Sequence, residues 1–89
     1  MIVEFDKSFL RYLNKIKDVD LHHKIASIIY KLEEADVLSD VKEVSKLTGF
    51  RNYYKIRIGD YRLGFEKITA KKIILIIISD RKDIYKKFP

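Results

Sequence analysis

The clearest structural signal in the chain lies at residues 54–66, which read YKIRIGDYRLGFE. Apolar and basic residues alternate before Gly59, as they do in a strand with one buried face. Gly59 and Asp60 form a dipeptide suited to a tight hairpin turn, because glycine readily adopts the backbone angles that such turns need. The stretch therefore predicts two antiparallel strands, over 50–58 and 61–68.

The segments on either side of this hairpin extend the prediction. Residues 73–78 are apolar without alternation, which favours a central strand over 72–79. The weaker turn at 69–71 would join this strand to the hairpin, and a last helical turn is expected over 82–88. Residues 37–49 lose any period and carry serine, threonine and glycine, so they predict a loop.

The N-terminal part predicts a strand and two helices. Residues 2–5 alternate as a short strand, Asp6 can cap a first helix, and Asp18 or Asp20 can cap a second that runs to about residue 36. The short connection favours an antiparallel helical hairpin. We expect a single α+β domain over 1–89, with the helical hairpin packed on a small antiparallel sheet in the order β-α-α-β-β-β.

The composition restricts the classes of partner and of site that the protein is expected to have. Lys and Arg total 19 against 13 Asp and Glu, for a net charge of +6, which points to a polyanion and first to nucleic acid. The absence of cysteine excludes disulfides and cysteine-bound zinc, and it fits a reducing cytoplasm. No signal peptide is expected. The longest apolar run, at 73–78, is far shorter than the ~18 residues that suggest a membrane span.

Basic side chains gather in and around the predicted hairpin. Lys55 and Arg57 lie two positions apart on one strand, so they project from the same face about 7 Å apart and can straddle a phosphate. Arg62 follows the turn, and its face depends on a register that the sequence leaves open. Arg81 and Tyr85 follow the central strand. These groups could converge on one open face of the sheet.

Such a face has the chemistry for cleaving RNA. Attack by a 2′-hydroxyl on its own phosphate needs a base, stabilisation of the crowded phosphorane and a proton for the leaving oxygen. Preorganised cations stabilise the developing charge. A lysine among other cations can have a lowered pKa and act as a base, and an aromatic ring can stack on a nucleobase.

The same residues carry a family resemblance. The pattern is Leu47-x-Gly49, then Tyr54-Lys55-x-Arg57-x-Gly59-Asp60-Tyr61-Arg62, then an apolar strand and Arg81-x-x-x-Tyr85. It resembles the RelE branch of the RelE/ParE toxins over nearly the whole chain. The resemblance implies an endoribonuclease that cuts mRNA in the ribosomal decoding site, leaves a 2′,3′-cyclic phosphate, and needs no metal or cofactor. It also implies a cognate antitoxin as partner.

The resemblance also assigns roles by position. Lys55 and Arg57 match the two basic residues that the family carries on this strand. Arg62 matches the arginine that stabilises the transition state. Arg81 matches the region that holds the general acid, and Tyr85 matches a tyrosine near the C-terminus of the family's proteins. Because arginine is essentially never deprotonated, we assign the base to Lys55. Glu43, from the segment before the sheet, is an alternative base. Asp80 stands where many relatives carry histidine. Further RNA contacts are expected at Lys46, Arg51, Lys86 and Lys87.

Other interpretations compete with this one. Lys55 and Arg57 could be the solvated face of a strand, Arg62 could pair with Glu66, and Arg81 could pair with Asp83 or Glu4. At the level of function, the alternatives are a ParE-like inhibitor of DNA gyrase, or an inactive toxin-like binding module. The crowded basic strand argues against the gyrase inhibitor, which needs no phosphate site.

Overall fold

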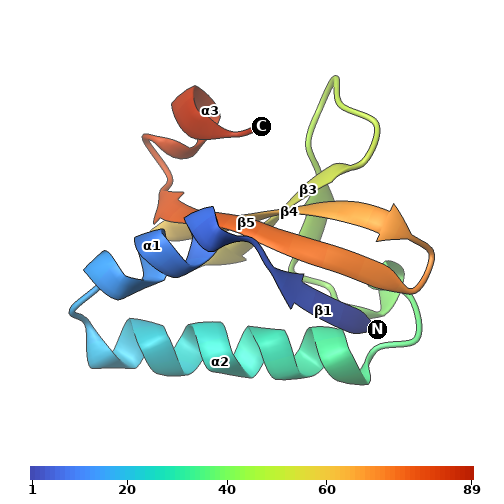
Figure 1. Cartoon of the computed structure of the whole chain (residues 1–89), viewed down its shortest axis with the longest axis horizontal. Helices are drawn as coiled ribbons and strands as arrows, with labels where there is room; N and C mark the ends of the chain where they lie inside the picture. The colour runs from blue at the N-terminus through green and yellow to red at the C-terminus, as the bar shows by residue number, and fades with distance from the viewer.

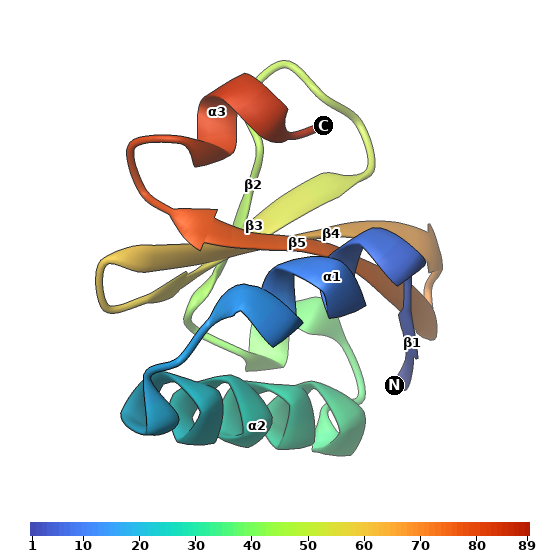
Figure 2. The same ribbon diagram turned by 60° about the vertical axis from the view of Figure 1, so that its left-hand side comes forward.

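Two helices cover one face of a five-stranded sheet, and a short third helix lies on the other face (Figures 1 and 2). The computed structural model describes residues 1–89. Its elements are β1 (Ile2–Phe5), α1 (Lys7–Lys15), α2 (Val19–Glu34), the 3-10 turn η1 (Leu38–Asp40), β2 (Val44–Lys46), β3 (Tyr53–Ile58), β4 (Tyr61–Thr69), β5 (Lys72–Asp80) and α3 (Ile84–Lys87). The strands lie in the order β1-β5-β4-β3-β2.

The α+β class and the antiparallel helical hairpin are confirmed, and the sheet differs from the prediction in two respects (Figure 1). It is mixed, because β1 runs parallel to β5, with Ile2 opposite Lys72. It also contains β2, at residues predicted to form a loop, and β3 begins only at Tyr53. The three residues of β2 have no readable period, and the strand exists through its pairing with β3.

The helix caps and the hairpin turn predicted from the sequence form in the structure. The Asp6 carboxylate accepts from the Ser8 amide at 3.0 Å, and the Asp18 carboxylate accepts from the Leu21 amide at 3.2 Å. Hydrogen bonds from the Ser8 hydroxyl and then the Ser8 amide lower the pKa of Asp6 below its ordinary 3.8. Gly59 has a φ of +59°, which the hairpin turn requires.

The main core lies between the sheet and the helices α1 and α2. Its fully buried side chains are Phe9, Ile25 and Leu32 from the helices and Ile56, Leu63, Phe65, Ile73 and Leu75 from the sheet. Burying one such side chain contributes about 1.5–3 kcal/mol, so this layer dominates the stability of the fold. Tyr54 stacks on Phe65 with ring centroids 5.5 Å apart and packs against the same core.

A second, smaller core attaches α3 to the opposite face of the sheet. It contains Leu47, Ile77, Ile84 and Phe88, all buried. Phe88 lies so close above Gly64 that a Cβ at this glycine would stand 2.8 Å from the Phe88 ring and 2.8 Å from Ile77. The bare backbone at Gly64 therefore lets the C-terminal segment lie flat on the sheet, which fixes α3 on this face, against β5.

Candidate functional site

The register of β3 and β4 decides which basic side chains share a face. Arg57 stands directly opposite Arg62, and Lys55 stands opposite Gly64. Paired residues in a ladder project from the same side, so Lys55, Arg57 and Arg62 all leave the sheet together. The alternate residues Ile56 and Ile58 are buried in the main core. The three cations therefore lie on the face that carries α3, away from α1 and α2.

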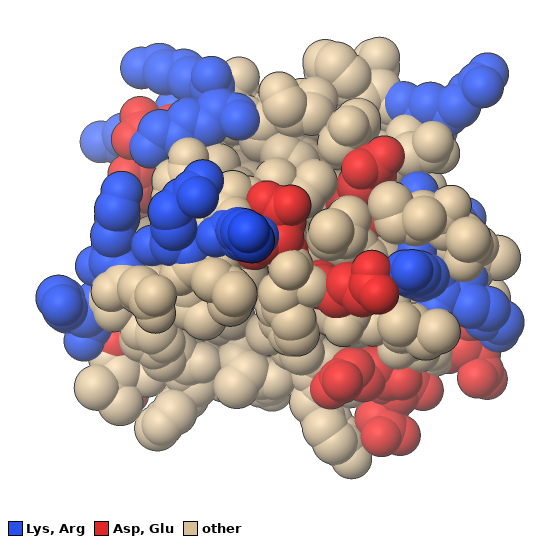
Figure 3. Space-filling view, viewed as in Figure 1, with Lys and Arg blue, Asp and Glu red and all other residues tan.

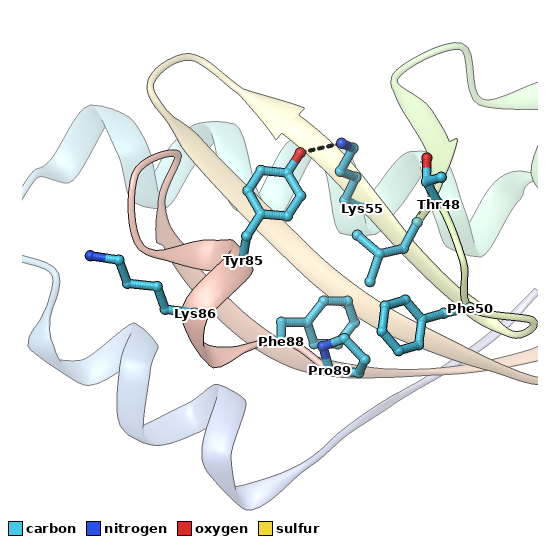
Figure 4. A pocket seen from close by; sticks show the side chains of 8 residues that line it. Thr48, Phe50, Lys55, Tyr85, Lys86, Phe88 and Pro89 are labelled. Atoms are coloured by element: carbon cyan, nitrogen blue, oxygen red, sulfur yellow. Dashed lines mark hydrogen bonds between the residues drawn. The ribbon is translucent and has the colours of Figure 1, made fainter.

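Lys55 and Tyr85 form the closest polar contact on this face. The Lys55 amine donates to the Tyr85 phenol oxygen, and Nζ lies 4.8 Å from the centroid of the Tyr85 ring (Figure 4). Lys55 is half-buried, whereas Tyr85 remains 57% exposed. Because the lysine donates to the phenol oxygen, the hydroxyl hydrogen of Tyr85 stays free to donate to another group. A strand and the terminal helix thus place an amine and a phenol side by side.

None of the predicted cations is neutralised by a carboxylate. The ion pairs of the molecule are Lys31–Glu43 at 2.9 Å and Lys72–Glu4 at 3.4 Å. The alternative pairings of Arg62 with Glu66 and of Arg81 with Asp83 or Glu4 are therefore absent. Arg57 is exposed. An unpaired cluster of this kind attracts an anion.

Arg62 is held close to the hairpin turn. Its Nη1 donates to the carbonyl oxygens of Gly59 and Tyr61, at 2.9 and 2.8 Å. The remaining nitrogens of the guanidinium have no partner in the protein and can donate to a ligand. Arg62 therefore belongs to the basic face with its head group at the end of the sheet where β3 turns into β4.

Arg81 lies at the same end of the sheet. Its backbone amide donates to the Asp60 carbonyl at 2.9 Å, which ties the segment after β5 to the hairpin turn. The Asp80 carboxylate accepts from the amides of Lys82 and Asp83, both at 3.0 Å. Asp80 thus caps the turn that leads into α3, and it fixes where Arg81 leaves the sheet.

The structure does not bring Glu43 or Lys46 to this face. Glu43 binds Lys31 of α2, and that hydrogen bond lowers the pKa of its carboxyl. Lys46 pairs with Tyr54, whose ring faces the main core, so its side chain leaves the sheet on the helix side. We therefore leave both residues out of the site. To act as the base, the Glu43 carboxylate would have to reach the basic face from the opposite side of the sheet, where α1 and α2 lie.

The other residues predicted to contact RNA lie at different places relative to this face. Arg51 is exposed in the loop between β2 and β3. Lys86 lines the same pocket as Lys55 and Tyr85, although its side chain extends away from them (Figure 4). Lys87 turns toward α1, with its amine 5.6 Å from the centroid of the Tyr12 ring. Of these, Lys86 lies nearest to the Lys55–Tyr85 pair.

Sequence reasoning missed the residues that support the site. Gly64 and Phe88 attach the C-terminal segment to the sheet, and Thr48 and Phe50 line a pocket beside Lys55. A glycine inside a strand pattern signals close approach of another chain segment, so Gly64 offered a usable signal. Phe88, one apolar residue after two lysines, gave no indication that it would be buried.

Charge is separated on the surface. Figure 3 shows lysine and arginine side chains gathered over the end of the molecule that carries α3, with acidic side chains gathered toward the C-terminal end of α2. No three His, Asp or Glu side chains come together as metal ligands would. None of the helices is both long enough and apolar enough to span a membrane.

A helical hairpin thus covers one face of the sheet, and a short helix and an open basic cluster occupy the other. The comparisons with known proteins are more specific. No family model matches the chain. The chain is 36% identical over 90 residues to Toxin RelE3 of Methanocaldococcus jannaschii, and the match covers 100% of both proteins. The chain belongs to the RelE toxin family.

Solved structures agree with this assignment. A chain of the RelB–RelE antitoxin–toxin complex from Methanococcus jannaschii is 32% identical, with a TM-score of 0.79 over 97% of this chain and 99% of that one. A mutant of E. coli toxin RelE in the free state superimposes with a TM-score of 0.71, over 97% of this chain and 90% of that one. At 18% identity, the second likeness concerns the fold alone.

Proposed function

We propose that this RelE-family toxin is a ribosome-dependent endoribonuclease that cleaves mRNA in the decoding site. The 2′-hydroxyl attacks the adjacent phosphorus, the bond to the 5′-oxygen breaks, and a 2′,3′-cyclic phosphate and a 5′-hydroxyl result. The observation that carries the proposal is the common face of Lys55, Arg57 and Arg62, none of them paired with a carboxylate. Such a face suits a phosphodiester and its more highly charged transition state.

Each residue has a role that its position supports. Lys55 accepts the proton of the 2′-hydroxyl, while Tyr85 donates its free hydroxyl hydrogen to a phosphate oxygen and presents its exposed ring to a nucleobase. Arg57 binds the phosphate before reaction. Arg62 supplies its free guanidinium donors to the phosphorane, and Arg81, from the same end of the sheet, stabilises the leaving 5′-oxygen, which takes its proton from water.

The proposal includes two macromolecular partners in the cytoplasm. The first is the ribosome with its bound mRNA, for which Arg51 and Lys86 add cations beside the site, with Lys87 on the neighbouring surface near α1. The second is a cognate antitoxin, since a relative with 32% identity forms a RelB–RelE complex. The net charge of +6 favours an acidic antitoxin segment over the basic face.

The test is to map cleavage on translating mRNA by primer extension and to analyse the new ends. We expect cuts at frame-linked positions, and 3′ ends that ligate to an adapter only after the cyclic phosphate has been removed. The Lys55→Ala protein should give no such cuts. Growth arrest with intact mRNA and blocked DNA replication would instead indicate a gyrase inhibitor, and no arrest would indicate an inactive binding module.

A further inference from the structure

A pocket of about 390 Å³ opens beside Lys55 and Tyr85, and the proposed reaction gives no role to the residues that line the rest of it (Figure 4). It lies between the loop that follows β2 and the C-terminal tail. Thr48 and Phe50 line it from the loop, and Phe88 and Pro89 line it from the tail. Lys55 belongs to its lining as well. Its volume falls at the lower end of the ~300–1,000 Å³ typical of small-ligand sites, which suits one nucleobase with its ribose.

The pocket has an apolar floor and a polar rim. Figure 4 shows the rings of Phe50 and Phe88 together with Pro89 at one level, and the Thr48 hydroxyl and the Lys55 amine on the same side above them. Flat apolar surfaces below and hydrogen-bonding groups above match the two parts of a nucleotide. The base can lie against the rings, while the phosphate remains with the lysine.

Phe50 is held for such a contact. It is 45% exposed, which is unusual for a phenylalanine that is fixed in place. Its ring meets Tyr53 edge to face at a centroid distance of 6.3 Å, and Tyr53 meets the buried Phe88 in the same way at 5.5 Å. This chain of rings anchors Phe50 to the second core and leaves part of it open to the pocket, so stacking a base on it costs little ordering of the side chain.

We propose that this pocket is a base-binding subsite for the nucleotide that adjoins the phosphate at Lys55. The base stacks on Phe50, and the Thr48 hydroxyl hydrogen-bonds its edge, so the pocket sets both the affinity for mRNA and a preference for particular bases. The inference rests on the proposed function, since it takes the phosphate at Lys55 to belong to RNA. The amine of Lys55 at the rim favours a nucleotide over an apolar side chain of a protein partner.

The experiment compares cleavage rates and cut-site profiles for the wild type, Phe50→Ala, Phe50→Trp and Thr48→Val on translating ribosomes. Stacking on a protein ring contributes enough that Phe50→Ala should lower kcat/KM about 5- to 100-fold, and Phe50→Trp should restore it. Thr48→Val should change the base found beside the cut, and it should lower kcat/KM less than Phe50→Ala does, because it removes a hydrogen bond and keeps the stacking ring. Tyr30→Ala, an exposed aromatic on α2 that lies outside the pocket, is the matched control and should leave both unchanged.

The outcomes separate this inference from the proposed function. Suppose that thermal unfolding shows the Phe50→Ala protein to be folded, and that it cleaves with the wild-type rate and profile. That result overturns the subsite and leaves the proposed nuclease activity unaffected. Unchanged cleavage combined with lost neutralisation by the antitoxin encoded beside the toxin overturns it too, and assigns the pocket to a protein side chain. A wild-type chain that cuts no mRNA defeats the proposed function, and the subsite with it.

Discussion

Arg57 and Arg62 stand directly opposite each other across β3 and β4, so two guanidinium groups leave the same face of the sheet from adjacent strands. Like charges at opposed positions of a ladder destabilise it, by roughly 0.2–1 kcal/mol. No carboxylate offsets the repulsion, because the ion pairs of the molecule lie elsewhere. The pair therefore costs stability in the free protein and is relieved when an anion binds between the two groups.

Replacing Arg57 by threonine should consequently have opposite effects on stability and on activity. We expect Arg57→Thr to raise the free energy of unfolding by about 0.2–1 kcal/mol, since it removes the repulsion and threonine suits a strand. Cleavage of mRNA should fall, because a phosphate contact is lost. Urea unfolding and single-turnover cleavage measure the two effects. Arg51→Thr removes the same charge from a loop and should give no gain in stability; an equal gain would refute the ladder argument.

Gly64 is the position where a single methyl group should disturb the site from a distance. The Cβ of Gly64→Ala would lie 2.8 Å from Phe88 and from Ile77, so we expect a loss of about 1–3 kcal/mol and a displaced α3. Cleavage should fall with it, because Tyr85 would move away from Lys55. Thermal unfolding and cleavage rates check both effects.

A second substitution tests whether the clash with Phe88 is the cause. In the Gly64→Ala background, Phe88→Leu should recover part of the stability, whereas the same change in the wild type should reduce it. This non-additivity is expected only for residues in contact. Strictly additive effects of the two substitutions would show that the close approach of Phe88 to Gly64 is not what limits position 64.

The sequence predicted those parts of the fold that short-range signals specify. Asp6 and Asp18 accept hydrogen bonds from nearby backbone amides, and Gly59 adopts the positive φ of the turn. The residues next to them in the sequence are therefore enough to predict the caps and the turn. The alternation around Lys55 likewise showed that it shares a face with Arg57. These features depend on residues at most a few positions apart.

The parts that escaped prediction depend on pairing between distant segments. The face of Arg62 follows from the β3–β4 register, and β2 and the parallel pairing of β1 follow from which neighbour each strand meets. Phe88 is buried because Gly64, far away in the sequence, leaves room for it. The same long-range placement removed Glu43 and Lys46 from the site, although their sequence positions suggested that they belonged to it.

The Asp6 cap predicts how stability depends on pH. The pKa of Asp6 is lowered in the folded protein, chiefly by the Ser8 hydroxyl, so the carboxylate stabilises the fold above its ordinary pKa of 3.8. This contribution is lost as the pH falls through the lowered value. Asp6→Asn keeps a capping oxygen without the charge, and it should be less stable than the wild type near pH 7, by a margin that shrinks as the pH falls below 3.8. A stability difference that stays constant between these pH values contradicts the cap.

Asp80 should act on cleavage through the turn that it caps. Asp80→Ala leaves the amides of Lys82 and Asp83 without their acceptor, which should cost about 1 kcal/mol of stability and shift Arg81. We expect slower cleavage, with partial recovery in Asp80→Asn, because the amide oxygen still accepts a hydrogen bond. If Asp80→Asn were as slow as Asp80→Ala while fully folded, the carboxylate would have a chemical role rather than a positional one.

The central claim is that the mRNA backbone lies on one face of the sheet, with Lys55 at its centre. Lys55→Ala and Lys46→Ala remove the same charge from neighbouring strands but from opposite faces. The most direct measurement is the single-turnover rate of mRNA cleavage on ribosomes for these two proteins. A loss of about 10²–10⁴-fold in Lys55→Ala, with an unchanged rate in Lys46→Ala, is the predicted result. Equal losses in both, or the larger loss in Lys46→Ala, would contradict it.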